Sequence, residues 1–407
     1  MRETLLRPRT LGIVLLAALL ILFPYLNTWP LFGGFLGSYR TFQATMFAVW
    51  LLVVLSMNLL TGYSGQISLG HAALVAVGAY ITAILFDQYA FPLGLAVLVA
   101  GIATGVMGGV IIGVPAVRLS GPYLAIATFS LIIALPQILK MDIEVAGLGI
   151  DVTGWTGGPN GIRISELQPL GFVDGFVDRR QWLYYTSMFA AVTMTFLAWN
   201  LIRSRIGRAF VALRDSEVGA EQMGVNVRLY KALAFGISSG YAGIGGGLFF
   251  MVQANISPGS MDLQTSINFL IAIVVGGLAT ILGSIIGAIY LTFQSELISN
   301  FAPRIAQVVP SQVFQEPESS LRGVIFGSIL ILTIITFPRG LAGAVYSLLR
   351  WSPARAGPRA DLSWWLARLQ AATPLGRSKQ IQEAASSEKS HRDSTAETRD
   401  HPDEGRG

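Results

Sequence analysis

The chain has 407 residues, of which 53% are hydrophobic and only 13% are charged, with a formal net charge of +5 and no cysteine. Soluble globular domains carry roughly 25% charged residues, so this composition indicates a membrane protein. The lack of cysteine excludes disulfides, thiol catalysis and cysteine-based metal sites. The small positive excess lies mostly in short loops and tails without interleaved aromatic residues, which argues against a nucleic-acid surface.

The N-terminus carries three arginines before its first apolar run, residues 11–22. Secretory signals begin in the same way, but no clean small-x-small cleavage site follows here. Pro24, Trp29 and Pro30 lead on into a further apolar stretch instead. We therefore predict that the first span is retained.

Apolar stretches follow one another as far as residue 349. A membrane helix needs roughly 20 mainly apolar residues, because the hydrocarbon core is about 30 Å thick. We predict an all-α polytopic membrane protein of about ten spans over residues 1–350. The predicted spans are residues 11–26, 42–60, 69–86, 92–114, 123–139, 183–202, 232–252, 263–275, 278–298 and 323–337.

Basic residues in short loops predict the orientation, because such loops stay in the cytoplasm. With the arginine-rich N-terminus inside, alternating spans place Arg118, the charged loop 203–231 and the C-terminal tail on the cytoplasmic side as well. Loop 140–182 then becomes extracytoplasmic. Residues 351–407 are polar, rich in Ser, Glu, Asp and Arg, and short of core-forming side chains. They are predicted to form a disordered cytoplasmic tail.

A polar, glycine-rich segment joins the second and third predicted spans. Its candidate path or gate residues are Gly62, Gly65, Gln66, Ser68, Gly70 and His71. Glycine frees the backbone from helical angles, and polar side chains can satisfy the exposed backbone groups. The segment therefore predicts a helix broken inside the protein. Such breaks line the substrate path in many transporters, but close helix packing through small residues also uses glycine.

His71 is the only histidine before the tail. A lone histidine cannot make a zinc site, which needs three or four protein ligands. The favoured interpretation is a buried side chain with satisfied hydrogen bonds, and the alternative is a proton relay or a ligand contact.

The charged loop, residues 203–231, interrupts two long apolar stretches with six basic and three acidic side chains. From residue 209 to residue 223 it contains no proline, and the spacing of Phe210, Val211, Leu213, Val218 and Met223 suits one face of a helix. A glycine at position 224 is where a helix C-terminus is expected. The loop thus predicts a single amphipathic cytoplasmic helix, which either binds a partner or lies on the membrane surface.

Two further segments are rich in small residues. Residues 153–162 contain four glycines but lack the lysine of a phosphate-binding loop, so we expect a compact outer loop that serves as a docking or gating surface. Ala279, Gly283 and Gly287 are spaced by four. That spacing places them on one helical face and predicts close packing against a neighbouring helix.

Together these segments resemble the permease subunit of high-affinity branched-chain amino acid ABC importers, specifically the longer, M-type of its two paralogous membrane subunits. The resemblance covers roughly residues 42–341 in the order of the family. It rests on residues 62–72, on Gly121-Pro122-Tyr123 with Ala125, on residues 156–161, on Gly207-Arg208 through Gly224, on residues 276–288 and on residues 337–341.

The resemblance implies that residues 1–350 form a permease domain in a bacterial-type inner membrane and that the charged loop couples it to an ATPase. Ala220, Glu221 and Gly224 match the reduced coupling motif of such permeases, and the full coupling set is Gly207, Arg208, Arg214, Asp215, Glu217, Ala220, Glu221 and Gly224. The implied partners are a second homologous permease, two ABC ATPase subunits and an extracytoplasmic binding protein. No cofactor is expected on this chain, since ATP and magnesium would bind the ATPase subunits.

The substrate and the energy source have alternatives. The same family contains permeases for urea and short-chain amides. An ion-coupled secondary transporter would bury ionisable groups in its spans, and only Glu296 and His71 qualify, with Asp87 and Asp262 near span ends. A membrane enzyme would need clustered carboxylates, histidines or a nucleophile with its base, and the sequence shows none.

Overall fold

The computed structural model describes residues 22–24, 38–119, 121–141, 144–145, 150–164, 178–306, 327, 331, 335–336 and 340–350. The chain divides into two compact units, residues 1–346 and 347–407. Apart from residues 347–350, the described residues lie in the first unit. The predicted spans 11–26 and 323–337 lie largely outside the described residues, and the predicted tail lies wholly outside them, so these remain predictions.

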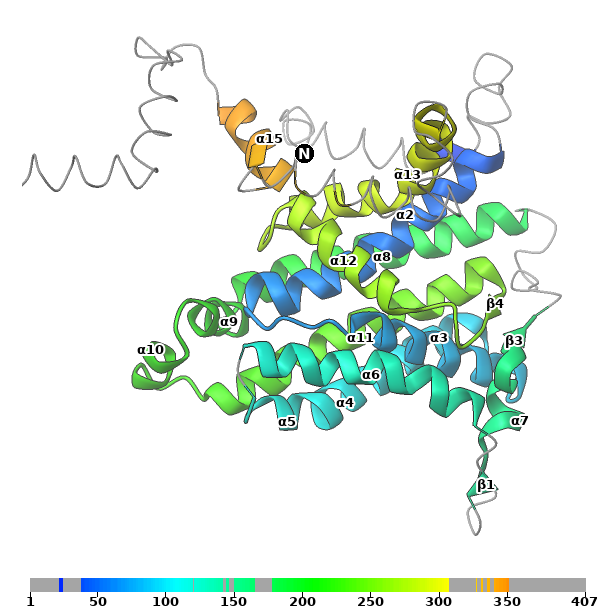
Figure 1. The fold of residues 1–407 in the computed structure, drawn as a ribbon, viewed down its shortest axis with the longest axis horizontal. Coiled ribbons are helices and arrows are strands. Elements are labelled where there is room, and N and C mark those ends of the chain that lie inside the picture. Colours follow the sequence, from blue (N-terminus) through cyan, green and yellow to red (C-terminus); the bar gives the residue numbers. More distant parts are fainter. Residues whose placement is uncertain are drawn as a thin grey trace, which may run out of the picture. The chain divides into compact units, whose positions relative to one another are not determined.

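The described part is almost wholly helical, which confirms the predicted fold class (Figure 1). Its elements in chain order are α2 (Ser38–Met57), η2 (Asn58–Tyr63), α3 (His71–Asp87), α4 (Leu93–Met107), η3 (Gly108–Gly113), α5 (Val114–Ala116), α6 (Pro122–Lys140), β1 (Glu144–Val145), β2 (Ile150–Asp151), α7 (Val152–Thr156), η4 (Gly158–Asn160), β3 (Ile162–Arg163), α8 (Arg179–Arg203), α9 (Arg205–Asp215), α10 (Glu217–Gln222), α11 (Val227–Gln253), β4 (Asn255–Ile256), α12 (Leu263–Gly276), α13 (Ile281–Ala306) and α15 (Gly340–Arg350).

Eight of the ten predicted spans are present as apolar helices. By length and composition, 5 helical stretches in the described part can cross a membrane: α2 with η2, α4 with η3 and α5, α6, α8 and α11. Shorter apolar helices account for the other three, namely α3, α12 and the first part of α13. At about 1.5 Å per residue, the 14-residue α12 is too short to cross a 30 Å core alone.

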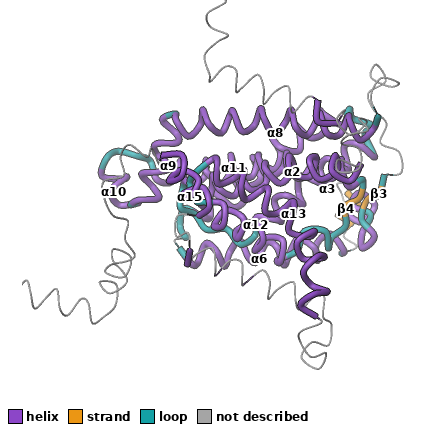
Figure 2. Tube along the Cα trace, turned by 90° about the horizontal axis from the view of Figure 1, so that it is seen from above, coloured by secondary structure: helices purple, strands orange, loops and turns teal. Residues whose placement is uncertain are grey.

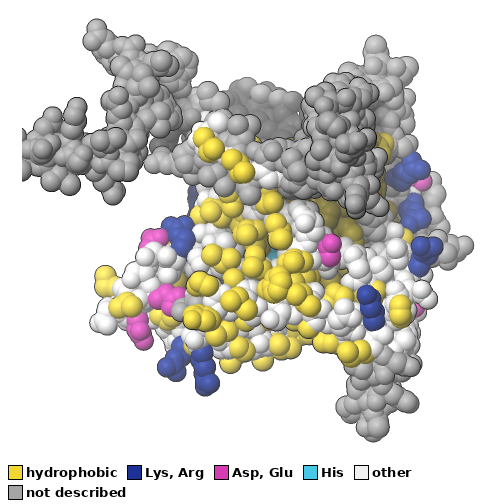
Figure 3. Space-filling model, in the orientation of Figure 1, with side chains coloured by type: hydrophobic (Ala, Val, Ile, Leu, Met, Phe, Trp, Pro, Cys, Tyr) yellow, Lys and Arg dark blue, Asp and Glu magenta, His cyan; other side chains and the backbone are white. Residues whose placement is uncertain are grey.

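Helices α2 and α11 form the centre of the unit, with α8 on one side and α6 on the other (Figure 2). The most apolar windows of α2 and α11 are 78% and 72% buried, against 22% for α6 and 17% for α8. The outer helices instead expose large apolar side chains, such as Ile102 and Phe189, over a broad surface (Figure 3). Water would not tolerate a surface of this kind, whereas lipid solvates it.

Helices α4 and α11 approach closely through a row of glycines that the sequence analysis did not single out. Gly101, Gly105 and Gly109 are spaced by four on one face of α4 and η3. A Cβ on Gly105 would lie 3.1 Å from the carbonyl oxygen of Gly236 on α11. A side chain at these positions would push the two helices apart, as in other membrane helix pairs packed through small residues.

The predicted close packing of residues 276–288 is confirmed for two of its three small residues. A Cβ on Gly287 would lie 2.5 Å from the carbonyl oxygen of Ala272, and Gly283 packs against the backbone of Gly277. The prediction is wrong for Ala279, which precedes α13 and has φ +56°. It belongs to the turn between α12 and α13, because its N–H donates to Asn58 Oδ1 at 2.9 Å instead of entering a helix.

The loops gather at two opposite ends of the bundle. Helices α5, α9 and α10 lie at one end, and α7, β3 and β4 lie at the other (Figure 1). Strand β3 pairs with β4 in antiparallel register, Ile162 opposite Ile256. The charged loop and the outer loop are therefore separated by the length of the membrane helices, as alternating spans require. Which end faces the cytoplasm remains a prediction.

Candidate functional site

The predicted break in the helix lies between η2 and α3. Helix α2 continues into the π-helical η2, which ends at Tyr63, and α3 begins at His71. The residues between them are not helical, yet Ser64, Gln66 and Ser68 are buried. Irregular backbone at membrane depth is stable only inside protein or beside water, and π-helical turns are frequent at functional sites.

Neighbouring helices satisfy the backbone of this broken segment, residues 64–70. The N–H of Leu69 donates to Thr128 Oγ1 of α6 at 3.0 Å, and the N–H of Ala72 donates to Ser266 Oγ of α12 at 2.9 Å. Gly70 packs directly on the backbone of Thr128, where a Cβ would not fit. Helices α6 and α12 therefore hold the start of α3 in place.

His71 is fully buried, and its Nε2 lies 2.7 Å from Ser56 Oγ. Ser56 Oγ also donates to the carbonyl oxygen of Val53 at 2.6 Å. Since a hydroxyl has one proton to donate, Nε2 carries a proton in this geometry and Nδ1 is an acceptor. Among the described residues, His71 Nδ1, Gln66 Oε1 and Ser68 Oγ have no hydrogen-bond partner. The broken segment and the first residue of α3 thus present three buried polar atoms able to bind water or a solute.

Asn58 links the helix break to the turn between α12 and α13, a role that the sequence analysis missed. Its Nδ2 donates to the Thr280 carbonyl oxygen and to Ser284 Oγ, each at 2.8 Å, while its Oδ1 accepts from Ala279. Gly62 follows one turn later, and a Cβ there would meet the Asn58 side chain and lie 2.6 Å from Ala279 N. The sequence offered one sign of this role: Asn58 is an amide inside the apolar run 47–60, and buried polar side chains join membrane helices.

The charged loop forms two short helices, α9 and α10, so the prediction of a single coupling helix is wrong. Ser216 separates them with an extended backbone at φ −165° and ψ 116°. Its Oγ accepts from the N–H of Gly219 at 3.0 Å, so Ser216 is the N-cap of α10. This local hydrogen bond competes with helix continuation at a residue whose side chain favours caps.

Gly224 ends α10 as predicted. It has φ +79°, a conformation that costs glycine little. The N–H of Val225 donates to the Ala220 carbonyl oxygen and the N–H of Gly224 to that of Glu221, each at 3.0 Å. This pair of bonds is a Schellman motif.

The predicted single apolar face of the loop divides between two surroundings. Phe210 and Leu213 of α9 are buried, and the Phe210 ring meets that of Tyr230 edge-on. By contrast, Val218 is 71% and Met223 is 86% exposed, so the prediction that these two share one helical face with Phe210 and Leu213 is wrong. The turn at Ser216 rotates them away from α9, and with the exposed Glu221 they form a mixed apolar and acidic surface, the α10 surface (Figure 3).

Ion pairing and close packing hold the remaining coupling residues. Lys231 of α11 is 4% exposed and pairs with Glu217 of α10 at 2.7 Å. Gly207 packs on the backbone of Ile202, where a Cβ would clash. Arg208 is exposed and donates to the Arg203 carbonyl oxygen at 3.2 Å. Asp215 is also exposed and accepts from Arg214. Ala220 is buried.

Arg214 brings the charged loop and the helix break together. Its Nη1 donates to the carbonyl oxygen of Gly62 at 3.3 Å. Gly65 has φ +75°, and a Cβ on it would lie 2.9 Å from Arg214 Cγ and 3.0 Å from Arg214 Cα. Two groups of residues predicted separately are thus in direct contact, with glycine at both contact points.

These features define a polytopic α-helical membrane protein whose water-exposed loop contacts a break in a central membrane helix. Residues 39–334 match the family described as branched-chain amino acid transport system / permease component, and the chain belongs to that family. It is therefore the membrane subunit of an ABC transporter, a component that does not itself catalyse a reaction.

Curated relatives agree with this assignment. The chain is 30% identical over 348 residues to the high-affinity branched-chain amino acid transport system permease protein LivM of Escherichia coli, covering 80% of this chain and 74% of that protein. LivM of Salmonella typhimurium is 29% identical over 73% of this chain. The autoinducer 2 import system permease protein LsrC of Salmonella paratyphi B is 27% identical over 50% of this chain. No solved structure matches the chain.

Proposed function

We propose that this permease imports branched-chain or related hydrophobic amino acids into the cytoplasm by alternating access, driven by ATP hydrolysis on partner subunits. The substrate class is supported by the named transport of the two LivM relatives, which match most of this chain. The LsrC match covers a smaller part. Urea and short-chain amides are the alternative substrates.

The proposed complex contains a second homologous permease, two ABC ATPase subunits and an extracytoplasmic binding protein, all in the inner membrane or beside it. The α10 surface suits an ATPase groove, because Val218 and Met223 offer exposed apolar contacts beside the Glu221 carboxylate. The outer loop at the opposite end is pinned by β3 and β4 and suits the binding protein. In this orientation both termini are cytoplasmic.

The observation that carries the mechanism is the contact of Arg214 with Gly62 and Gly65. An ATPase that moves α9 and α10 also moves Arg214. Arg214 contacts Gly62, within η2, and Gly65, just after it. The break can follow, because residues 64–70 are held by individual hydrogen bonds and not by a continuous helix. Nucleotide-driven movement is thereby converted into movement of the broken segment.

Within this mechanism the broken segment is the gate. Gly62, Gly65 and Gly70 allow close backbone approach, and Gln66, Ser68 and His71 carry the three buried polar atoms without partners among the described residues. Polar atoms of this kind can hydrogen-bond a passing solute that has lost part of its hydration shell.

The proposal can be tested with the complex reconstituted in proteoliposomes, by measuring the uptake of radiolabelled leucine and the rate of ATP hydrolysis. Glu221→Arg reverses the charge of the α10 surface, and Gly224→Asp places a side chain at a positive φ. Both should abolish substrate-stimulated ATP hydrolysis while leaving the chain inserted. Glu144→Gln at the opposite end is the control and should keep wild-type stimulation. Unchanged transport in both coupling variants would refute the coupling role, and uptake of urea or acetamide without leucine uptake would refute the substrate.

A further inference from the structure

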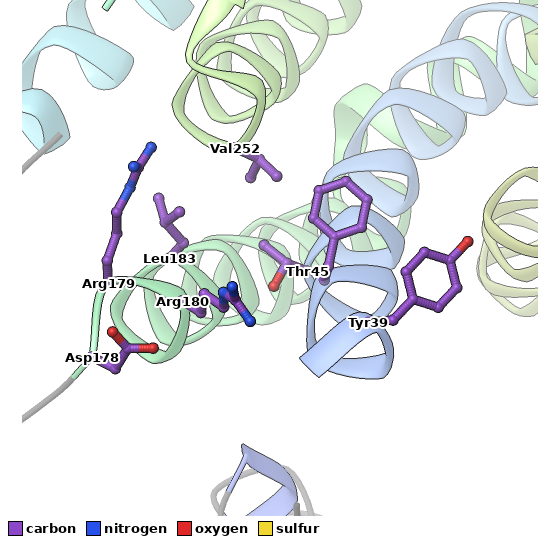
Figure 4. Close-up of a pocket in the computed structure, with 8 residues that line it drawn as sticks. Tyr39, Thr45, Asp178, Arg179, Arg180, Leu183 and Val252 are labelled. Atoms are coloured by element: carbon purple, nitrogen blue, oxygen red, sulfur yellow. The ribbon is translucent and has the colours of Figure 1, made fainter. Parts of the chain in front are cut away.

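Two adjoining cavities lie at the end of the bundle opposite α9 and α10, between the start of α2, the start of α8, the end of α11 and the start of α12 (Figure 4). The cavity beside α8, here the mouth, has a volume of about 580 Å³. The cavity beside α12 and α13, here the chamber, has a volume of about 370 Å³. Tyr39 and Phe42 line both, so the mouth and the chamber meet at these two side chains.

The mouth combines both signs of charge. Asp178, Arg179 and Arg180 line it from the start of α8, and Tyr39 and Thr45 line it from α2 (Figure 4). The guanidinium group of Arg180 reaches toward α2, and the Asp178 carboxylate lies at the same end of α8. A guanidinium binds a carboxylate through paired N–H donors, and a carboxylate binds an ammonium group. The mouth therefore has the chemistry to hold a zwitterion.

The chamber has the opposite character, since none of the described residues that line it is charged. Trp50 forms an aromatic wall with Phe249 and Phe269, with ring centroids 5.6 and 5.7 Å apart. Met46 and Met261 complete the apolar lining, and methionine adapts to ligands of different shape. A volume of this size is at the small end of the range for ligand pockets, about 300–1,000 Å³.

Carboxamide groups supply the chamber with hydrogen-bonding capacity without charge. Gln43, Asn268 and Gln294 line it from three different helices. Gln43 is fixed through its Nε2, which donates to Glu296 at 2.7 Å, and Glu296 pairs with Arg40 at 3.1 Å. Gln294 Oε1 is buried and has no partner among the described residues, so it can accept a hydrogen bond from a ligand.

We propose that the mouth and the chamber form the site at which an amino acid first binds this permease: Asp178 and Arg180 recognise the zwitterionic head group, and the chamber accepts an uncharged, apolar side chain. This inference rests on the proposed function and adds to it the residues that select the substrate. A charged side chain is rejected in the chamber because burying an ion without a counter-charge is costly. The neutral lining thus explains why amino acids with uncharged side chains would be preferred over those with charged ones.

Photolabelling tests occupancy directly. The assembled complex with its ATPases and binding protein is irradiated with L-photo-leucine, a diazirine analogue of leucine, and labelled peptides are identified by mass spectrometry. We expect label on α2 and α12 near Met46, Trp50 and Met261, reduced at least tenfold by excess leucine. Competed label that never falls on the chamber would overturn the inference.

A charge-insertion pair tests selectivity. Asn268→Asp adds a carboxylate to the chamber wall, and Gln88→Glu adds one at the same end of the bundle, outside both cavities. We expect Asn268→Asp to lower leucine uptake at least tenfold at pH 7.5 and less at pH 5.5, because burial raises the pKa of a carboxyl group and the protonated form is neutral. Gln88→Glu should remain within twofold of the wild type.

The two hypotheses fail in different ways. If Asn268→Asp does not assemble with its partners by size-exclusion chromatography, Gln294→Glu on α13 takes its place. Wild-type uptake of leucine that is insensitive to both chamber variants overturns the binding site but leaves the proposed function standing. A wild-type complex that takes up no leucine, isoleucine or valine overturns the proposed function, and the inference with it.

Discussion

Arg214 contacts the helix break through two parts of its side chain: Nη1 donates to the Gly62 carbonyl oxygen, 3.3 Å away, and Cγ lies where a Cβ on Gly65 would approach to 2.9 Å. The arginine lies on a loop that water reaches, and the two glycines end a helix that is among the most buried in the unit. A residue that touches both a solvent-exposed loop and the membrane core can transmit movement between them.

Replacing Arg214 by methionine should uncouple ATP hydrolysis from transport. Methionine keeps an apolar stem but removes the donor to Gly62. A hydrogen bond from a charged group contributes about 1.5–3 kcal/mol, and this one contributes less because the Arg214 side chain is 35% exposed and solvent screens its charge. We expect at least a tenfold rise in ATP hydrolysed per leucine imported. Arg205→Met, an exposed position on the same helix, is the control, and equal ratios in both variants would contradict the assignment.

Gly65→Ala should also impair the coupling of ATP hydrolysis to transport, in this case for a steric reason. Both Gly65 and Gly121 have positive φ, at +75° and +53°, so alanine introduces backbone strain at both sites. Of the two, Gly65 faces a neighbour, whereas no non-neighbouring atom in the described part of the chain lies within 4 Å of a Cβ on Gly121. Leucine uptake should fall several-fold in Gly65→Ala and much less in Gly121→Ala.

A double-mutant cycle between Gly65→Ala and Arg214→Met separates direct contact from general strain. Residues in contact show coupling of about 0.5–3 kcal/mol, so the double variant should transport better than the product of the single effects predicts. Multiplicative effects on uptake would show that the two residues act independently.

Asn58→Leu should lower the stability of the folded chain, and not only its transport activity. The substitution removes an amide that makes three hydrogen bonds to the turn between α12 and α13, and each buried group left unpaired costs about 1–3 kcal/mol. The apparent melting temperature of the purified complex should fall clearly. Asn200→Leu, on the exposed side of α8, should melt like the wild type, and identical melting of the two variants would refute the role of Asn58.

Ser216→Ala should weaken binding of the ATPase subunits. Loss of an N-cap costs about 1 kcal/mol, and α10 is only six residues long, so its first turn should fray and the α10 surface with it. Ser216→Asp retains a cap and should restore binding, measured as the affinity of the detergent-purified permease for its ATPases. A weakened Ser216→Asp variant would show that the hydroxyl acts in another way.

Much of the architecture followed from local chemistry. Eight predicted spans are apolar helices because their residues are apolar over the length that a bilayer demands, and the break after Tyr63 follows from glycines and small polar residues that favour local backbone bonds. Gly224 ends its helix for a reason that lies within six residues. Structural features that depend on residues close together in the chain can be predicted from sequence.

Contacts between distant segments could not be predicted in the same way. Ser216 was compatible with either a continuous helix or a cap, and packing of Phe210 and pairing of Glu217 with the buried Lys231 accompany the cap that divides the loop. The sequence by itself determined a helical membrane permease with a charged loop and a helix break. Only the tertiary structure decided that Arg214 joins them and that neutral side chains from four helices line the chamber, because such contacts depend on how helices pack and not on any pattern within one of them.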